Sequence, residues 1–559
     1  MPRLRLLPLL CVLGSLAAPA AAHAAAEPGI NLSLPFSQAD VQNVQASGSK
    51  TARFFMFTTN DPAQFDGPVA QLAAIGVKPV FVVLGDPASP PTTPAAIASY
   101  ASFVGRAAAH FRGQVAGWEI WNEEDAPKFW AGMPALDEDH PDRNAAPYVP
   151  LLKASYTALK AADPATPVVL GGLTGNDYKF LQSVYDNGGG NSFDVVATHT
   201  DTGCAIGSPY GYYRDTPGGP ISQWAFLGYR SVHDVMAAHG DTNKQIWLTE
   251  MGWSSYTGTC AVGKWAGQKA AGVSEADQAK FTTEAMHCLT PDPYVAKVLL
   301  FKLNEDSAPD PMDVAYGAIR ANGQRKPLFN AWQTFATKGD VLPDSEQCGD
   351  FQPPTVTIDA PTDGAVFATS LPIQASATDG TGVARISLYA DGSQSEIRNF
   401  TDKNAPASLS GKINWQGAKK LAPGAHKITV TAVDPMGNVG TKTVTVTKVD
   451  PSRLKAIKTL VRLKLSGKGA KRTLKVSVVP RTPGLTHLLG KLQVVFQKKV
   501  KGHWKTAHKY GRSAKGTDAK PTAFTVKLKK AQWRVQVVYT ATKGTSYGSS
   551  RSSFLKFKV

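Results

Sequence analysis

The C-terminal part of the sequence almost lacks acidic residues. Residues 451–559 contain 27 lysines and arginines but one acid, Asp518. The whole chain of 559 residues carries a formal net charge of +17, whereas its first 450 residues are net −9. The positive charge therefore belongs to one terminal segment, and this asymmetry argues against a uniformly basic nucleic-acid-binding protein.

Long hydrophobic runs are also missing. The mostly apolar run Leu6–Leu16 is too short to cross a bilayer, and no later run of about 18 apolar residues follows. Arg3 and Arg5 precede this run, and small residues at 22–26 follow it. This pattern is typical of a secretory signal peptide, so residues 1–26 are predicted to be removed and the protein to be secreted, with no transmembrane segment.

Cysteine is scarce. Without Cys11 of the leader, four cysteines remain, and no CxxC or close Cys/His cluster is present. We therefore expect no metal site and no cofactor. An even number of cysteines in an exported protein favours disulfides, for which three pairings exist. The four cysteines are Cys204, Cys260, Cys288 and Cys348.

Short apolar stretches alternate with helical patterns from about residue 30 to 332. Helical patterns cover, for example, Thr93–Phe111 and Val149–Ala162. Eight such units predict a (β/α)₈ barrel at residues 27–350; the alternative, a doubly wound sheet, would have a glycine-rich first turn, which is missing. The predicted strands are Ile30–Leu34, Arg53–Phe57, Val80–Leu84, Ala116–Trp121, Val168–Gly171, Val195–His199, Ile246–Thr249 and Val298–Leu303.

Two β modules are predicted after the barrel. Alternating runs between turn signals predict a β-sandwich at residues 352–450. Strands at residues 453–559 alternate apolar and basic residues, which predicts a second sandwich with one basic, solvated face. The fold class is therefore a multidomain chain, a barrel followed by two β-sandwich modules.

Two glutamates end predicted barrel strands. Glu123 ends the fourth strand and Glu250 ends the seventh. Because barrel active sites lie at the C-terminal ends of the strands, both carboxylates are expected to face one pocket. Paired carboxylates are the groups that glycoside hydrolysis requires.

In this context the chain resembles clan A glycoside hydrolases such as families 5 and 39. The resemblance rests on Asn122-Glu123, on Glu250 and on the surrounding segments, including 148–172, 193–199 and 316–327. It implies an acid/base role for Glu123, a nucleophile role for Glu250, and retention of configuration. This chain has Glu124 where the family usually has proline.

Further site candidates follow from the same resemblance and from their place above the barrel. Asn122, Arg53 and His199 are predicted to bind substrate, although Arg53 and His199 also suit buried polar groups that are already satisfied. Glu119 is interpreted as structural. Four aromatic residues are predicted to contact sugar, with core or lid packing as the alternative. These are Trp130, Tyr210, Trp253 and Phe301.

The barrel also favours one cysteine pairing. Cys204 and Cys260 follow the sixth and seventh strands, in neighbouring loops, and Cys288 and Cys348 flank the last unit. We therefore expect Cys204–Cys260 and Cys288–Cys348.

The function predicted from the sequence is that of a secreted retaining β-glycosidase that acts on a poly- or oligosaccharide. The middle module resembles bacterial immunoglobulin-like domains and is interpreted as a spacer. The basic module, 453–559, is predicted to bind an anionic cell-surface polymer, and its sequence shows no outward aromatic residues for stacking nucleic-acid bases. We expect a monomer. The alternative is a barrel that has lost activity and binds carbohydrate or cell wall.

Overall fold

The structure is a computed structural model. It describes residues 26–134, 144–200, 204, 207–261, 266–306, 310–399, 407–413, 417–450, 458–480, 490–514, 521–541 and 548–559. The chain divides into two compact units, Met1–Tyr212 with Ile221–Gly349, and Tyr213–Pro220 with Asp350–Val559. The predicted signal peptide lies outside the described residues, except for its last residue.

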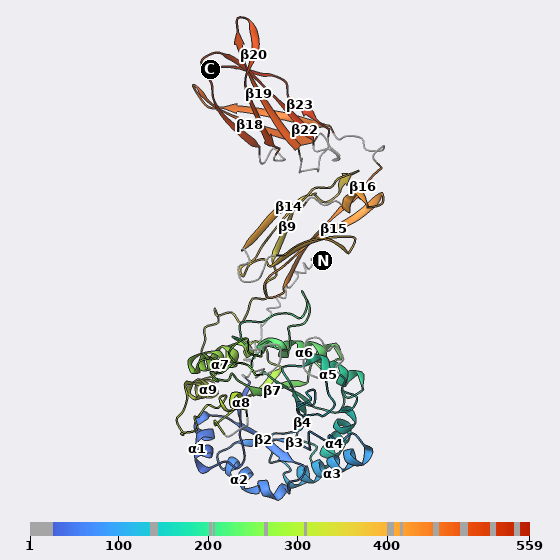
Figure 1. The fold of residues 1–559 in the computed structure, drawn as a ribbon, viewed down its shortest axis with the longest axis vertical. Helices are drawn as coiled ribbons and strands as arrows, with labels where there is room; N and C mark the ends of the chain where they lie inside the picture. Colours follow the sequence, from blue (N-terminus) through green and yellow to red (C-terminus); the bar gives the residue numbers. More distant parts are fainter. Residues whose placement is uncertain are drawn as a thin grey trace, which may run out of the picture. The chain divides into compact units, whose positions relative to one another are not determined.

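The first unit contains a closed barrel of eight parallel strands in sequential order (Figure 1). This confirms the predicted barrel. Each strand pairs with its neighbours, and β1 closes the ring against β8. The strands are β1 (Glu27–Asn31), β2 (Thr51–Phe57), β3 (Lys78–Leu84), β4 (Gly117–Asn122), β5 (Val168–Leu173), β6 (Val195–His199), β7 (Gln245–Met251) and β8 (Val295–Leu300).

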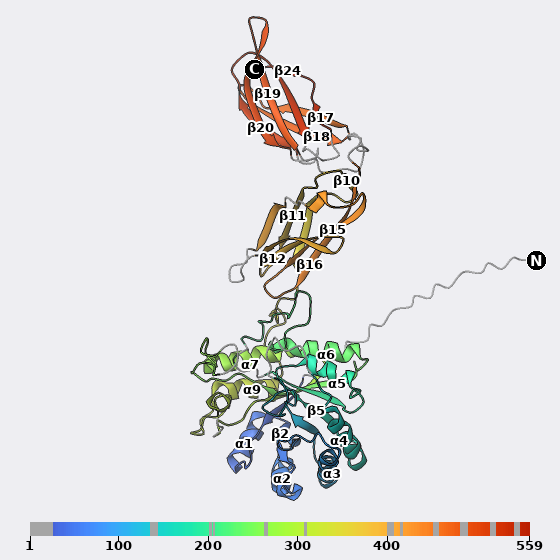
Figure 2. The same cartoon turned by 45° about the vertical axis from the view of Figure 1, so that its right-hand side comes forward.

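Helices surround the barrel, as Figures 1 and 2 show. Local sequence sets several of their starts: the Thr93 side chain caps the helix that begins with Pro94, and Ser274 caps the one that begins with Glu275. The helices are α1 (Gln38–Ser47), η1 (Pro62–Phe65), α2 (Asp66–Ala74), α3 (Pro94–His110), α4 (Val149–Ala162), α5 (Tyr178–Asp186), η3 (Phe226–Gly228), α6 (Tyr229–Ala238), α7 (Glu275–Leu289), α8 (Pro311–Val314) and α9 (Pro327–Lys338).

An apolar cluster fills part of the barrel interior. Val80, Val169, Val195, Ala197 and Trp247 pack together there, and all are buried. A side chain at the neighbouring Gly117 would lie 2.8 Å from the Trp247 ring, so this position requires glycine. The polar residues of β4 and β7 come later along the strands and therefore lie toward their C-terminal ends.

The described residues of the second unit form four β-sheets, which confirms β-sandwich modules after the barrel. One core joins the sheets β10-β16-β15-β12-β13 and β14-β11-β9; another joins β17-β18-β21 and β20-β19-β22-β23, with β24 paired to β22. The strands are β9 (Thr355–Ala360), β10 (Ala365–Phe367), β11 (Ile373–Thr378), β12 (Arg385–Ala390), β13 (Ser393–Asn399), β14 (Ser408–Ile413), β15 (Gly424–Val433), β16 (Val439–Lys448), β17 (Thr459–Ser466), β18 (Lys471–Pro480), β19 (Gly490–Val500), β20 (His503–Ser513), β21 (Thr522–Lys527), β22 (Gln532–Ala541), β23 (Ser550–Arg551) and β24 (Leu555–Lys558), with a short helix η5 (Gly417–Lys419).

A segment of the chain between β6 and α6 belongs to this second unit. The Gly218 N–H donates to the Gly437 carbonyl at 2.9 Å, and Arg214 Nε donates to Asn438 Oδ1 at 3.3 Å. Asn438 is itself held by Asp434, to which both its backbone and its side chain donate. Residues 213–220 are therefore anchored to the turn between β15 and β16, which their place within the predicted barrel did not indicate.

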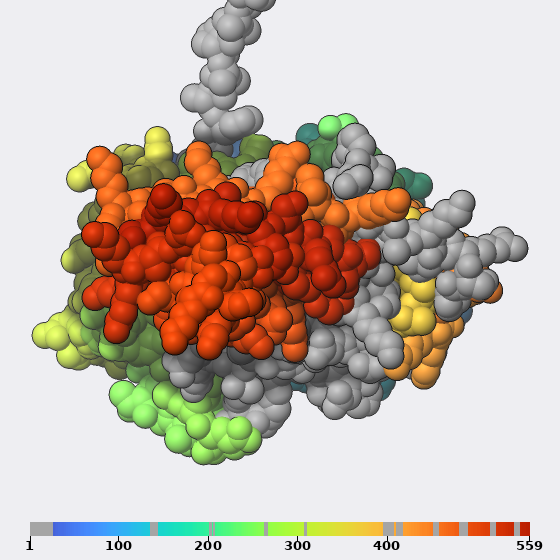
Figure 3. All heavy atoms as spheres, turned by 90° about the horizontal axis from the view of Figure 1, so that it is seen from above, coloured from blue at the N-terminus to red at the C-terminus, as the bar shows by residue number. Residues whose placement is uncertain are grey.

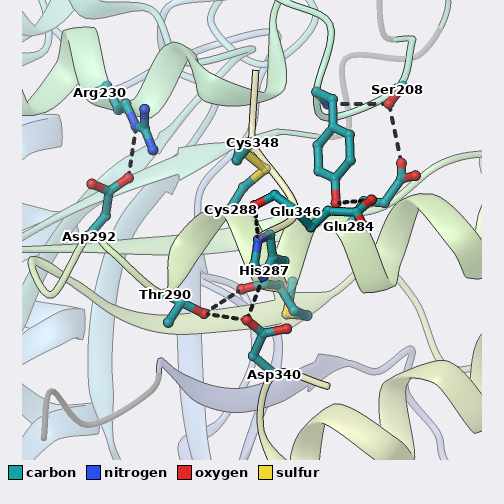
Figure 4. The surroundings of a disulfide bond; sticks show 12 residues. Ser208, Arg230, Glu284, His287, Cys288, Thr290, Asp292, Asp340, Glu346 and Cys348 are labelled. Carbon is teal, nitrogen blue, oxygen red and sulfur yellow. Dashed lines mark hydrogen bonds and ion pairs between the residues drawn. A yellow bond between two sulfur atoms is a disulfide. The ribbon is translucent and has the colours of Figure 1, made fainter. Parts of the chain in front are cut away.

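Two disulfides connect the four cysteines, Cys204 with Cys260 and Cys288 with Cys348. Figure 4 shows the second bond, which joins α7 to the segment after α9. Beside it, His287 Nδ1 contacts Asp340 Oδ2 at 2.7 Å, and His287 Nε2 contacts the Glu346 carbonyl at 3.0 Å. Within the described ranges, no helix combines the length and the apolar character that a membrane span needs.

Candidate active site

Glu123 and Glu250 meet at the C-terminal ends of β4 and β7. An oxygen of each carboxylate lies within 4.8 Å of the other. Glu250 is 7% exposed and Glu123 is half-buried. Trp121 and Glu123 have positive φ values of 76° and 48°, a conformation that residues other than glycine rarely adopt. The backbone at the end of β4 therefore leaves the regular strand where Glu123 is presented.

Arg53 of β2 connects these strands in the barrel interior. It is 1% exposed, and its Nη1 lies 2.6 Å from Glu250 Oε1. Its Nε and Nη2 lie 2.7 and 2.9 Å from the two carboxylate oxygens of Glu119, a bidentate pair. Nη2 also donates to Asn122 at 2.7 Å, and Nη1 donates to Asn31 at 3.0 Å. One fixed guanidinium thus orients Glu250 and Asn122 together.

His199, the last residue of β6, lies between the two glutamates. Its Nδ1 is 2.8 Å from Glu123 Oε1, and its Nε2 is 3.7 Å from Glu250 Oε1. The imidazole is fully buried, and Nε2 has no hydrogen-bond partner among the described residues. The structure therefore brings together Arg53, Asn122, Glu123, His199 and Glu250, five residues that the sequence predicted for one site.

The pKa values of Glu250 and His199 are shifted in opposite directions. Burial disfavours the ionised form of Glu250, but the charges of His199 and Arg53 outweigh burial and hold its pKa below the ordinary value of 4.5. Burial also disfavours charge on His199, yet Glu250 and Glu123 raise its pKa from 6.5 to about 9. At neutral pH the site therefore contains an ionised Glu250 and a protonated His199.

The paired glycines of β5 make room for buried side chains. A Cβ at Gly172 would lie 2.1 Å from His199 Nε2, and one at Gly171 would lie 2.0 Å from Glu124 Oε2. Glu124 is fully buried and its oxygens have no partner among the described residues; burial, with the nearby Asp125, raises its pKa well above the ordinary value. A protonated, neutral Glu124 is consistent with this environment. The glycine pair therefore positions the groups behind the site.

The aromatic candidates occupy different environments. Trp130 and Trp253 are 2% and 3% exposed. Trp130 packs against Trp121 and Tyr148, and Trp253 packs against Phe226 and Phe281. Both rings therefore pack as the alternative interpretation expects, and their predicted contact with sugar stays a prediction.

Tyr210 and Phe301 are only partly buried. The Tyr210 hydroxyl donates to Glu346 at 3.2 Å, and the Phe301 ring packs edge-on against Tyr316 at 5.3 Å. Their predicted contact with substrate stays a prediction.

Two groups of side chains in the described part of the chain place possible metal ligands within 4.8 Å of one another: Glu123 with His199 and Glu250, and Asp350 with Asp379 and Asp434. In the first group, Arg53 and protonated His199 already neutralise Glu250. In the second, Asp434 already accepts two hydrogen bonds from Asn438. The expected absence of a metal stays a prediction.

Sequence reasoning missed two members of the site. Asn31 donates to the Thr249 carbonyl at 2.8 Å besides accepting from Arg53, and so connects β1, β2 and β7. Asp125, buried in the loop after β4, accepts from the backbone and the hydroxyl of Thr174. Asn31 ends β1 as Asn122 ends β4, and the barrel rule that identified Asn122 would have found it.

Comparison with family models finds one match, a bacterial Ig domain over residues 354–430. This agrees with the immunoglobulin-like module predicted after the barrel. No curated protein sequence matches the chain.

Among solved structures, the chain is similar to several glycoside hydrolases. One is a family 39 glycoside hydrolase from Bacteroides cellulosilyticus WH2, with 18% identity, 69% of this chain and 78% of that chain covered, and a TM-score of 0.44. A glucosidase from Croceicoccus marinus has 14% identity, coverage of 93% and 96%, and a TM-score of 0.42. A monomeric β-xylosidase from Caulobacter crescentus CB15 has 13% identity, coverage of 93% and 96%, and a TM-score of 0.40.

Proposed function

We propose that the protein is a secreted retaining β-glycosidase that cleaves O-glycosidic bonds of a poly- or oligosaccharide. The observation that carries the proposal is the approach of Glu123 and Glu250, whose nearest carboxylate oxygens lie within 4.8 Å. Retaining glycosidases place their carboxyl groups about 5–5.5 Å apart, whereas inverting ones leave about 6.5–9.5 Å for a water molecule. The short separation supports direct attack by one carboxylate.

In the first step, an oxygen of Glu250 attacks the anomeric carbon and the bond to the leaving oxygen breaks. Glu123 gives its proton to that oxygen, so an alcohol leaves and a glycosyl ester of Glu250 forms. In the second step, Glu123 takes a proton from water as the water oxygen attacks the same carbon. The ester bond breaks, and both glutamates return to their starting states.

Arg53 and His199 prepare the two glutamates for this chemistry. Arg53 keeps Glu250 ionised and aimed, because its guanidinium is fixed by Glu119 and Asn122. His199 Nδ1 contacts a carboxylate oxygen of Glu123. The hydrogen bond between these two side chains orients the carboxyl group that donates the proton to the leaving alcohol. Preorganised charges of this kind stabilise the transition state without reorganisation during the reaction.

Signs of export support the proposal that the glycosidase is secreted. The N-terminal pattern is that of a leader, and the chain forms two disulfides, which persist in oxidising compartments. An exported glycosidase would meet its polysaccharide outside the cell.

The test uses a panel of β-glycosides with aryl leaving groups. Wild-type protein should hydrolyse at least one of them, and Glu250→Gln should abolish this activity while leaving thermal unfolding intact. Glu123→Ala should retain attack on glycosides with strongly acidic leaving groups, which need no proton, and azide should accelerate its turnover by replacing water. Glu346→Gln, an exposed substitution of the same kind, serves as the matched control.

The outcomes separate the two candidate functions. Equal activity of Glu250→Gln and wild type would contradict the mechanism. Failure of wild-type protein to hydrolyse any glycoside in the panel, together with binding of the sugars, would favour the inactive carbohydrate-binding barrel.

A further inference from the structure

The C-terminal module carries positive charge that no acidic side chain of its described residues balances. Its described residues, 458–480, 490–514, 521–541 and 548–559, contain no aspartate or glutamate. Cationic residues also lie directly opposite one another: Lys464 pairs with Lys475, and Arg534 pairs with Lys556. Like charges in such positions destabilise a sheet. A polyanion bound beside Arg534 and Lys556 would offset the repulsion at that pair.

The module has two outward faces, and they differ in kind. On the three-stranded sheet, Lys475 lies between Lys464 and the exposed Ala523, and no aromatic ring is exposed among the described residues of its strands. The outer face of β20-β19-β22-β24 adds two aromatic rings, Trp504 and Phe554, the latter 39% exposed. This second surface is named the Arg534 face, after the residue between those rings. In Figure 3 the module's atoms, orange to red, form much of the surface turned to the viewer.

Arg534 is held in a fixed orientation on this face. The centre of its guanidinium lies 4.8 Å from the Trp504 ring centroid and 3.9 Å from the Phe554 ring centroid. Its Nε donates to Gln497 Oε1 at 2.7 Å, and Gln497 in turn donates to Thr506 at 3.3 Å. The two Nη groups make no hydrogen bond within the described part of the chain. A stacked guanidinium with free Nη donors is preorganised to receive an anionic group at two points.

We propose that the Arg534 face binds a carboxylated polysaccharide. Arg534 would take one carboxylate, and the exposed Lys499 and Lys556 on neighbouring strands would take the flanking charges of the same polymer. Amide and hydroxyl groups of Gln497 and Thr506 lie in the same row of the sheet as Arg534, where they can bond sugar hydroxyls. The surface thus alternates charge with neutral polar groups, as an acidic glycan does. The proposal is independent of hydrolysis in the barrel.

Arg534 limits the stacking of nucleic-acid bases on the same two rings. Binding of single-stranded nucleic acid relies on aromatic rings with open faces on which bases stack. Arg534 covers one face of Trp504 and of Phe554. The expected lack of outward aromatic residues is corrected: Phe554 is 39% exposed, and only the strand order shows that residues 504, 534 and 554 meet.

The test measures binding of the full-length protein to polygalacturonate by isothermal titration. Arg534→Gln combined with Lys556→Gln should weaken binding by about tenfold or more, since charged hydrogen bonds are lost. The matched control is Lys464→Gln combined with Lys475→Gln, which removes the same charge from the other face and should change affinity by less than about twofold. Thermal unfolding establishes that both variants fold.

Four further measurements decide the assignment. Arg534→Lys keeps the charge but loses the planar fork, and it should bind more weakly than wild type. Binding to polygalacturonate should decrease as salt is raised, and neutral galactan should not compete. Equal loss from both double variants, undiminished binding by Arg534→Lys, equal binding to galactan, or tighter binding to single-stranded DNA than to polygalacturonate would each overturn the proposal.

Discussion

His199 bridges the two candidate catalytic carboxylates, with Nδ1 2.8 Å from Glu123 and Nε2 3.7 Å from Glu250. This buried imidazole therefore interacts with both carboxylates of the proposed double displacement. It sits where a positive charge favours ionisation of the nucleophile and where a hydrogen bond orients the proton donor. The consequences for pH dependence can be measured.

Replacing His199 should shift the acid limb of the activity profile. Burial alone would raise the pKa of Glu250, and His199 with Arg53 lowers it below 4.5. The wild-type acid limb of kcat/KM should therefore lie below about pH 4.5, and His199→Gln should move it to higher pH. The profile is measured with an aryl glycoside from pH 3 to 7.

His287→Gln is the matched control for this experiment. His287 also contacts a carboxylate, Asp340, at 2.7 Å, but it lies on α7 beside the Cys288–Cys348 bond. Its substitution should leave the acid limb in place. An unchanged limb in His199→Gln would contradict the electrostatic role of the imidazole.

Stability should depend on pH through the same residue. The pKa of His199 in the folded protein, about 9, exceeds its ordinary value of 6.5 because of Glu250 and Glu123. Its contribution is fully present below about pH 6.5 and is lost as pH rises through 9. The melting temperature of the barrel in wild type, minus that in His199→Gln, should therefore decrease between pH 6.5 and 9.5. A difference that is constant or increases would refute the raised pKa.

Gly172→Ala should lower activity by about a hundredfold, because displacing a catalytic group by about 1 Å has that effect. The new Cβ would lie 2.1 Å from His199 Nε2, and the imidazole is fully buried. Gly67→Ala in α2 is the control: nothing lies within 4 Å of its Cβ, and alanine favours the helix. Steady-state kinetics compare the two. Equal kcat/KM for both variants would mean that the glycine pair does not position His199.

Removing the Cys288–Cys348 bond should destabilise the barrel by about 2–5 kcal/mol. The bond closes a loop between residues 60 positions apart and fixes the segment that carries Glu346 to α7. The double variant Cys288→Ser, Cys348→Ser is compared with wild type by calorimetry without reductant. Identical melting temperatures would show that the contacts of His287 hold this segment without the disulfide.

The barrel strands and the glutamate pair could be predicted because both depend on local signals. Apolar stretches of strand length alternate with helical patterns, and a residue that ends a parallel strand faces the pocket whatever the loops do. Glu123 and Glu250 follow from that rule. The bidentate contact between Arg53 and Glu119 could not be predicted in this way. It depends on how far along the barrel axis the side chains of two different strands lie, and the sequence does not contain that information.

Other features required the three-dimensional arrangement. Trp130 and Trp253 are in loops, as expected, but the loops fold their rings inward among other aromatic residues. The segment 213–220 lies between β6 and α6 in sequence, yet it is grouped with the second unit. The Arg534 face combines four strands whose order the sequence leaves open. Composition showed that the module is basic but not where an anion would bind.

The most direct test of the double displacement is to trap its intermediate. A 2-deoxy-2-fluoro glycoside with an activated leaving group, matched to the sugar that the aryl-glycoside panel identifies, slows the second step more than the first. Mass spectrometry of the intact protein and of its peptides should find one fluoroglycosyl group, attached to Glu250. A label on another residue, or turnover of the parent glycoside with release of the inverted anomer, would contradict the proposed mechanism.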